Sequence, residues 1–100
     1  MSRRAPGDIL AHALERVLLE RLGPVRDLNH HWVDWHSATF TGARHAVAFT
    51  IDEERAGSLD GIADDNLSLT RGFVADVAMV SRSRGPDGVA VALDVLTLLD

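Results

Sequence analysis

The chain contains no cysteine, lysine, tyrosine or glutamine among its 100 residues. Without cysteine it has no disulfide bond, thiolate zinc site or thiol nucleophile. Without lysine it has no side-chain amine for Schiff-base chemistry. It also lacks a Gly-rich phosphate loop, a Gly-x-Ser-x-Gly elbow and a His-Glu-x-x-His pair. Any enzymatic function is therefore restricted to His/Asp acid–base chemistry or to metal-assisted chemistry.

Basic residues and long apolar runs are also scarce. The formal net charge is -5, whereas proteins that bind nucleic acid or anionic membranes by charge carry basic clusters. No stretch approaches the roughly 20 apolar residues that span a bilayer, and no apolar run typical of a signal peptide comes after the basic start. We expect a soluble cytoplasmic protein that binds neither nucleic acid nor membrane. Its ten basic residues are all arginine, which is typical of a GC-rich bacterial genome.

One helix is clearly marked, over residues 8–22. Asp8 is the predicted N-cap, and Gly23 followed by Pro24 ends the helix. Residues 1–7 are expected to be a flexible N-terminus. The apolar residues of the helix recur at three- and four-residue spacing and form one wide stripe: Ile9, Leu10, Ala13, Leu14, Val17, Leu18 and Leu22.

Two hairpins come after the helix. The first joins His31–Phe40 to Arg44–Ile51, and the second joins Phe73–Val80 to Val89–Leu99 around a Pro-Asp-Gly turn. One helix and two hairpins predict a single α+β domain. In it the N-terminal helix packs on an antiparallel sheet of about four strands, giving two layers.

Two polar connections flank the first hairpin. Residues 25–30 lead into it, so His30 and its neighbour His31 are expected to lie in a solvated turn. Residues 52–71 lead out of it and are acidic, with glycines that discourage a long helix and room for a single helical turn.

Both arms of the second hairpin are apolar on both faces. In Phe73–Val80 and in Val89–Leu99, apolar residues occupy odd and even positions alike. Because alternate residues of a strand point to opposite faces, a sheet made from these arms needs cover on both sides. The single helix covers only one side. We therefore expect a second copy of the protein to cover the other, as in a homodimer.

Asp34, His36 and His45 form the candidate catalytic site. If Phe40 lies opposite Ala43 in the first hairpin, His36 and His45 become diagonal neighbours on the face that also carries Asp34. Two imidazoles and a carboxylate at the edge of an apolar face suit proton transfer, with Asp34 orienting His36, or a divalent metal. The alternative is that all three side chains are solvated near the strand ends. No metal or other cofactor is assigned to the chain.

Three aromatic residues are candidate ligand or interface residues. Trp32 and Trp35 differ in parity and so point to opposite faces of a regular strand, and Phe40 lies close to the hairpin turn. Tryptophan is enriched at the energetically dominant positions of interfaces. The alternative role for both indoles is packing in the core.

Asp76 and Asp94 interrupt the apolar arms of the second hairpin. A turn at residues 85–88, with Arg84 opposite Val89, places the two carboxylates on opposite faces of the sheet. They are therefore not expected to form a carboxylate pair for acid–base chemistry.

The pattern as a whole favours a non-enzymatic, homo-oligomeric interaction module that binds a protein partner or a small apolar ligand. The first alternative is a small enzyme that uses His/Asp acid–base or metal-assisted chemistry in a cavity between helix and sheet. A second alternative is a phage or mobile-element protein that acts by binding a larger assembly.

Overall fold

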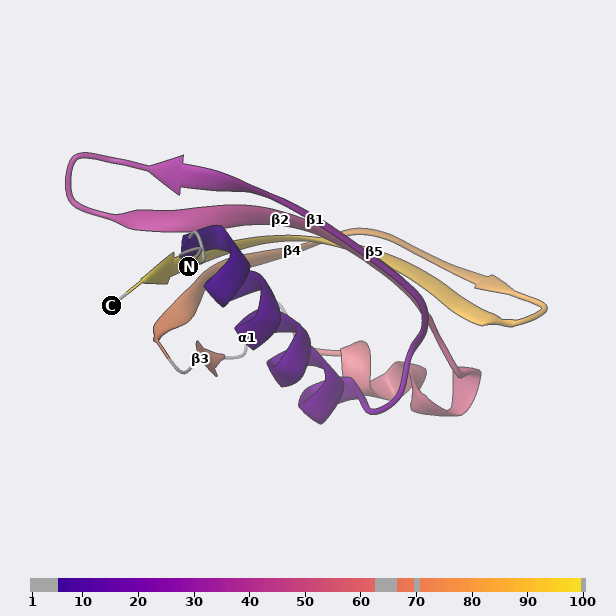
Figure 1. Ribbon diagram of the computed structural model, residues 1–100. Helices are drawn as coiled ribbons and strands as arrows, with labels where there is room; N and C mark the ends of the chain where they lie inside the picture. The colour runs from indigo at the N-terminus through magenta and orange to yellow at the C-terminus, as the bar shows by residue number, and fades with distance from the viewer. Residues whose placement is uncertain (1–5, 63–66, 70, 100) are drawn as a thin grey trace, which may run out of the picture.

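An N-terminal helix lies across one face of a five-stranded antiparallel sheet (Figure 1). The computed structural model describes residues 6–62, 67–69 and 71–99. The sheet order is β1-β2-β5-β4-β3, so the last strand in sequence is the central one. The elements, in chain order, are α1 (Pro6–Leu22), β1 (Arg26–His36), β2 (Thr41–Ile51), the 3-10 helix η1 (Glu53–Leu59), β3 (Ser68–Leu69), β4 (Gly72–Gly85) and β5 (Gly88–Leu99).

The predicted α+β class and two-layer architecture are confirmed, with one strand more than expected. The additional strand, β3, is only two residues long and pairs with the start of β4. A segment this short shows no alternation of apolar and polar residues, so sequence periodicity cannot reveal it.

The helix begins two residues earlier than predicted. It starts at Pro6, and Asp8 lies within its first turn rather than at the N-cap. Proline is well suited to the start of a helix, because its fixed φ is helical and its missing N–H has no partner there. At the other end Gly23 adopts a positive φ of 78° and donates its N–H to the Leu19 carbonyl, 2.8 Å away, as predicted for a C-terminal glycine.

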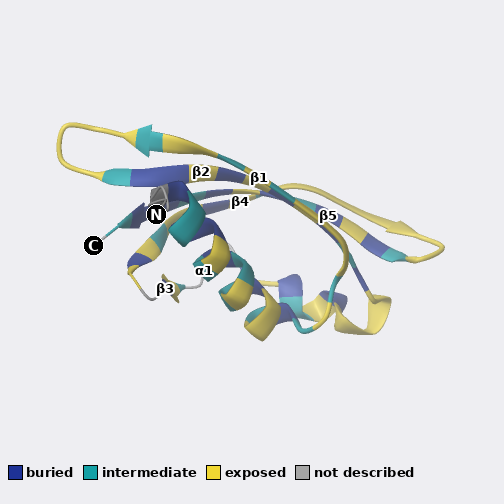
Figure 2. Ribbon diagram, viewed as in Figure 1, coloured by how far each residue is buried: buried dark blue, intermediate teal, exposed yellow. Residues whose placement is uncertain are grey.

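The hydrophobic core lies between α1 and the sheet. In β2 and β5 the buried residues alternate with exposed or partly exposed ones along most of each strand (Figure 2). The side chains of α1 that face the sheet pack against them. The largest core cluster contains Leu14, Leu18, Leu22, Val47, Phe49, Ile51, Ala56, Leu59, Ile62, Val77, Val89, Val91, Leu93 and Val95.

The connection after β2 covers the same face as the helix. Ala56 and Leu59 of η1 are buried in the core cluster. Arg82 of β4 holds this segment, because its guanidinium donates 3.1 Å hydrogen bonds to the Ala56 carbonyl and to the Asp60 carboxylate. The helical turn expected in residues 52–71 is therefore present as η1, and it extends the cover that α1 provides (Figure 1).

The opposite side of the sheet is not covered by any described segment of the chain. We call it the open face. The cross-strand register assigns to it the side chains that alternate with the core residues: His31, Val33 and Trp35 of β1, Arg44, Ala46 and Ala48 of β2, Ala90, Ala92, Asp94 and Leu96 of β5, and Phe73, Asp76 and Ala78 of β4.

The β-bulge at Val80, between the turn and Asp76, overturns the expected separation of Asp76 and Asp94. Arg84 pairs with Val89 as predicted, but the register shifts at Val80 and again at Ala75. Each bulge inserts one extra residue and reverses the parity of the residues beyond it. Asp76 therefore pairs with Leu96 on the open face, which is the face that carries Asp94.

Neither α1 nor any other helix in the described ranges has the length and apolar character needed to cross a membrane.

Candidate functional site

A row of hydrogen-bonded polar side chains crosses the core beneath α1. Glu15 of α1 lies 3.1 Å from His30 Nδ1, and His30 Nε2 lies 2.8 Å from His45 Nδ1. His45 Nε2 in turn lies 2.7 Å from the Thr97 hydroxyl, which is 3.4 Å from the Ala43 carbonyl oxygen. We call this row the histidine row. It connects the helix to strands β1, β2 and β5.

The two imidazoles of the histidine row are buried. His45 is 2% exposed, and the His30 side chain is 4% exposed. Burial lowers the pKa of His45 from its usual 6.5 to about 4, and the neighbouring His30 ring acts in the same direction. Burial disfavours the charged form of a histidine, so His45 is neutral at neutral pH.

Proton counting explains how the row is satisfied. One set of donors satisfies every contact of the row: Thr97 donates to His45 Nε2, His45 Nδ1 donates to His30 Nε2, and His30 Nδ1 donates to Glu15.

The structure does not bring together the three predicted catalytic residues. His36 pairs with Thr41 and His45 pairs with Trp32, so these imidazoles are separated along the hairpin. The expected pairing of Phe40 with Ala43 is incorrect, because Phe40 belongs to the loop that closes the hairpin. Asp34 and His36 do share the α1 side of the sheet with His45, as their parity predicted, but both are exposed.

His30 is the functional residue that the sequence analysis missed. A solvated turn is expected there, but β1 begins earlier, at Arg26, and His30 pairs with Val47. The available signal was its parity: His30 has an even number, as Trp32 and Asp34 do, and even-numbered residues of this strand share one face. Once β1 extends to Arg26, this parity places His30 on the side that faces α1.

The two rings of the histidine row are almost fully buried between α1 and the sheet. The centroid of a ring of the Trp32 indole lies 5.0 Å from that of the His30 ring. In the described part of the chain, no group of three or more His, Cys, Asp or Glu residues is arranged to hold a metal ion. This arrangement suits a structural role, in which the row fixes the helix on the sheet.

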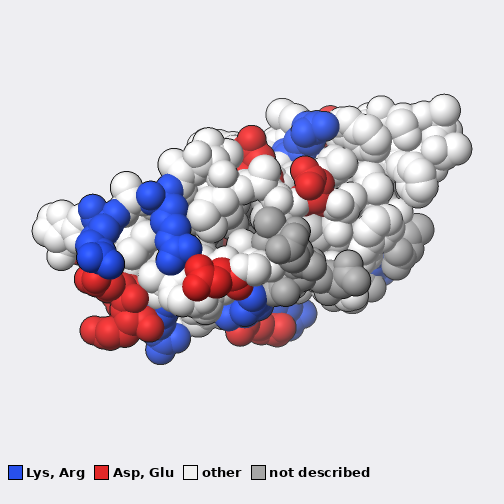
Figure 3. Space-filling model, turned by 180° about the vertical axis from the view of Figure 1, so that it is seen from behind, with Lys and Arg blue, Asp and Glu red and all other residues white. Residues whose placement is uncertain are grey.

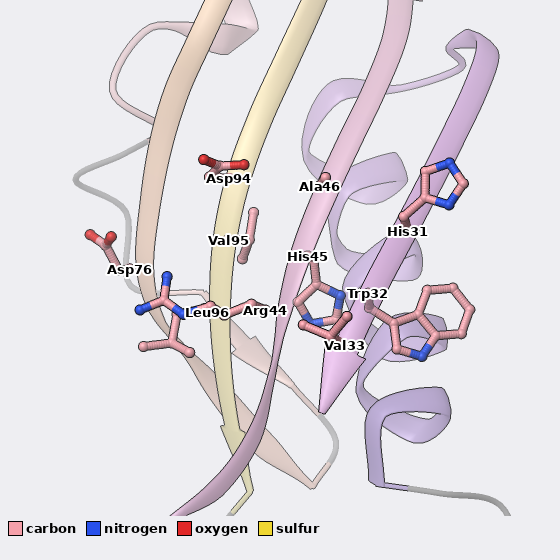
Figure 4. Close-up of a pocket in the computed structure, with 10 residues that line it drawn as sticks. All are labelled: His31, Trp32, Val33, Arg44, His45, Ala46, Asp76, Asp94, Val95 and Leu96. Atoms are coloured by element: carbon pink, nitrogen blue, oxygen red, sulfur yellow. The ribbon is translucent and has the colours of Figure 1, made fainter. Parts of the chain in front are cut away.

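The accessible site is a hollow of about 300 Å³ on the open face (Figure 4). Strand β1 provides one wall through His31 and Val33. The short side chain of Ala46 on β2 leaves the floor low between that wall and β4. The lining residues are His31, Trp32, Val33, Arg44, His45, Ala46, Asp76, Asp94, Val95 and Leu96.

One cation and two carboxylates stand in this hollow. Arg44 pairs across the sheet with Leu96, which pairs on its other side with Asp76. Asp94 lies one step further along β5, between Ala46 and Ala78. Among the ion pairs and hydrogen bonds formed by described residues, none involves Arg44, Asp76 or Asp94.

The three predicted interface aromatics lie on or next to the hairpin β1–β2. Trp32 faces α1 and Trp35 faces the open side, as their parity predicted, and both are partly buried. Phe40 is exposed in the hairpin loop. Residues 37–43 contain no charged side chain, whereas acidic and basic groups gather at the far end of the molecule, near η1 and the β4–β5 turn (Figure 3).

No protein-family model matches this chain, and no curated protein or solved structure shows a significant match to it. Its function is therefore inferred from its residues and their geometry.

Proposed function

We propose that the protein is a non-catalytic interaction module that pairs with a second copy of itself through the open face of its sheet. The observation that carries this proposal is a broad sheet face that no described segment covers. It combines exposed apolar side chains with charges of both signs that form no ion pair among the described residues.

Apolar exposure on this face supports the proposal. Val33 is 65% exposed in the middle of β1, and Phe73 is exposed on β4. Between them the central strands present alanines, whose small side chains allow another surface to approach closely. Burying these residues against a second copy releases water from apolar surface, at about 25 cal/mol per Å².

The charges on the face indicate what kind of surface would cover it. A purely apolar partner would bury Arg44, Asp76 and Asp94 without compensation, which is costly. A second copy brings the same three groups, so a two-fold arrangement can set Arg44 of each copy against a carboxylate of the other. Interfaces between identical subunits are self-complementary in this way.

The geometry gives less support to an acid–base enzyme. The histidine row is enclosed, and His36, the predicted base, lies exposed and away from His45. A general base has to reach the proton that it abstracts. The open face holds no hydrogen-bonded pair of nucleophile and base among the described residues.

Charge reversal on the open face tests the proposal. We expect Arg44→Asp and Asp94→Arg, each alone, to halve the mass measured by light scattering after size exclusion, because like charges then meet across the interface. Mixing the two variants in equal amounts should restore the mass, since each copy then offers the charge that the other lacks. A second mixture, of Asp76→Arg with Arg44→Asp, tests in the same way whether Asp76 is the carboxylate that meets Arg44 of the other copy.

Arg16→Asp is the matched control, because it makes the same charge change at an exposed position on α1 and should keep the full mass. A wild-type protein with the mass of one chain contradicts the proposal. So does a failure of both mixtures to restore the mass.

A further inference from the structure

We propose that the free edge of β1 is a second interaction surface, where β1 of another copy adds in antiparallel orientation and joins two sheets into one. This pairing is independent of the open-face contact, because it uses backbone groups in the plane of the sheet.

The edge of β1 is long and regular. The ladder to β2 continues without a break from Asn29 to His36, after a single bulge near Asp27. In the described ranges β1 pairs with no strand other than β2, and no other backbone hydrogen bond reaches it. Alternate N–H and C=O groups of this stretch therefore point outward, which is a template for another strand.

The opposite edge of the sheet shows how this fold blocks strand addition. From Ala75 onward β4 has no outer partner strand in the described ranges, but it is interrupted by bulges at Ala75 and Val80 and carries Arg82 and Arg84. Bulges and charged side chains are the devices that protect an edge from pairing. Between Asn29 and His36 the edge of β1 has no bulge, and Asp34 is its one charged side chain apart from the histidines.

Two indoles flank the free edge of β1, one on each face of the sheet. Trp32 lies on the α1 side and Trp35 on the open side, and neither is fully buried. An added strand would pack against both rings, so it would gain apolar contact on both faces in addition to its backbone hydrogen bonds. This position also engages Trp32, which lies on the α1 side and has no part in the open-face contact.

The side chains of β1 are complementary to themselves when Val33 lies on the two-fold axis. Val33 then faces its own copy, His31 faces the partner's Trp35, and Trp32 faces the partner's Asp34. Residues directly opposite each other share a face, so each indole meets a different group, His30 faces the partner's His36, and no two carboxylates meet. Shifting the axis to Asp34 would set two carboxylates against each other.

A single introduced cysteine tests this pairing, because the chain has no cysteine of its own. In Val33→Cys the two thiols meet on the axis at a Cα separation of about 4.5–5.5 Å, within the range that a disulfide spans. Val80→Cys is the matched control: both positions are valines on sheet edges, 65% and 61% exposed. We expect Val33→Cys to form a covalent dimer about tenfold faster or more, because pairing raises the local thiol concentration.

The same experiment in an Asp94→Arg background separates the two interfaces. Strand addition predicts that Val33→Cys still cross-links there, although the open-face contact is blocked, and that adding Trp35→Ala slows the reaction. If cross-linking disappears in that background, the thiols met across the open face and the edge proposal is wrong. Equal rates for Val33→Cys and Val80→Cys overturn it as well, whatever the fate of the open-face contact.

Discussion

Acidification from pH 6.5 to pH 4 is expected to remove about 3 kcal/mol of stability through His45 alone, because a pKa displaced by one unit corresponds to about 1.4 kcal/mol. The pKa of His45 falls from 6.5 to about 4 on folding. The unfolded chain therefore binds the proton more tightly than the folded one. The stabilisation that comes from the lowered pKa of His45 is fully present above pH 6.5. It declines as the pH falls, until the folded protein itself takes up the proton near pH 4.

Urea unfolding at intervals between pH 7.5 and pH 4 measures this effect. In His45→Gln the titrating ring is absent, so we expect a lower free energy of unfolding at neutral pH and a clearly weaker decline toward acid. His36→Gln is the control, because it removes an exposed histidine from the same hairpin and should leave the decline in place. A His45→Gln protein that loses as much stability as the wild type would show that other groups cause the decline.

Replacing Gly42 by alanine is expected to destabilise the protein by about 3 kcal/mol or more, in the class of severe backbone and packing defects. A Cβ at Gly42 would overlap the Thr97 carbonyl oxygen of β5 and lie 2.9 Å from Leu98 Cδ2. The first of these neighbours is backbone, which moves only if β2 and β5 separate.

The free energy of unfolding in urea is again the measurement, and Gly57→Ala is the matched control. Gly57 lies exposed in η1, and a Cβ there meets no atom within 4 Å. This control should stay within about 0.5 kcal/mol of the wild type, as surface substitutions usually do. If Gly42→Ala is equally harmless, the strands approach each other less closely than the structure indicates.

The sequence was sufficient for the elements whose apolar residues repeat regularly. The helix was predicted to within two residues, because its stripe continues from Ile9 to Leu22. Both hairpins were predicted from alternation, and the 85–88 turn is where the Pro-Asp-Gly signal placed it. The first hairpin was predicted to turn between Phe40 and Arg44, but its loop is residues 37–40 and Thr41–Ala43 belong to β2.

Register could not be predicted from the sequence. The bulge at Val80 reverses the face of residues 76–79, the bulge at Ala75 restores the expected parity beyond it, and no residue type marks either bulge. The same limit applies to the candidate site. Parity placed His45 on the correct face, but its contact depends on how the hairpin closes. A loop of residues 37–40 brings it next to Trp32 and His30 rather than near His36.

The central place of β5 in the sheet determines when folding can finish. This strand is the last in sequence, yet β2 and β4 both depend on it for pairing. While the chain is being synthesised, the first hairpin has no partner for its inner edge, and Val47 and Phe49 remain without their neighbours on β5. Pairings between distant segments form slowly. We therefore expect folding to be completed after the last strand leaves the ribosome, with the inner edge of β2 open to aggregation until then.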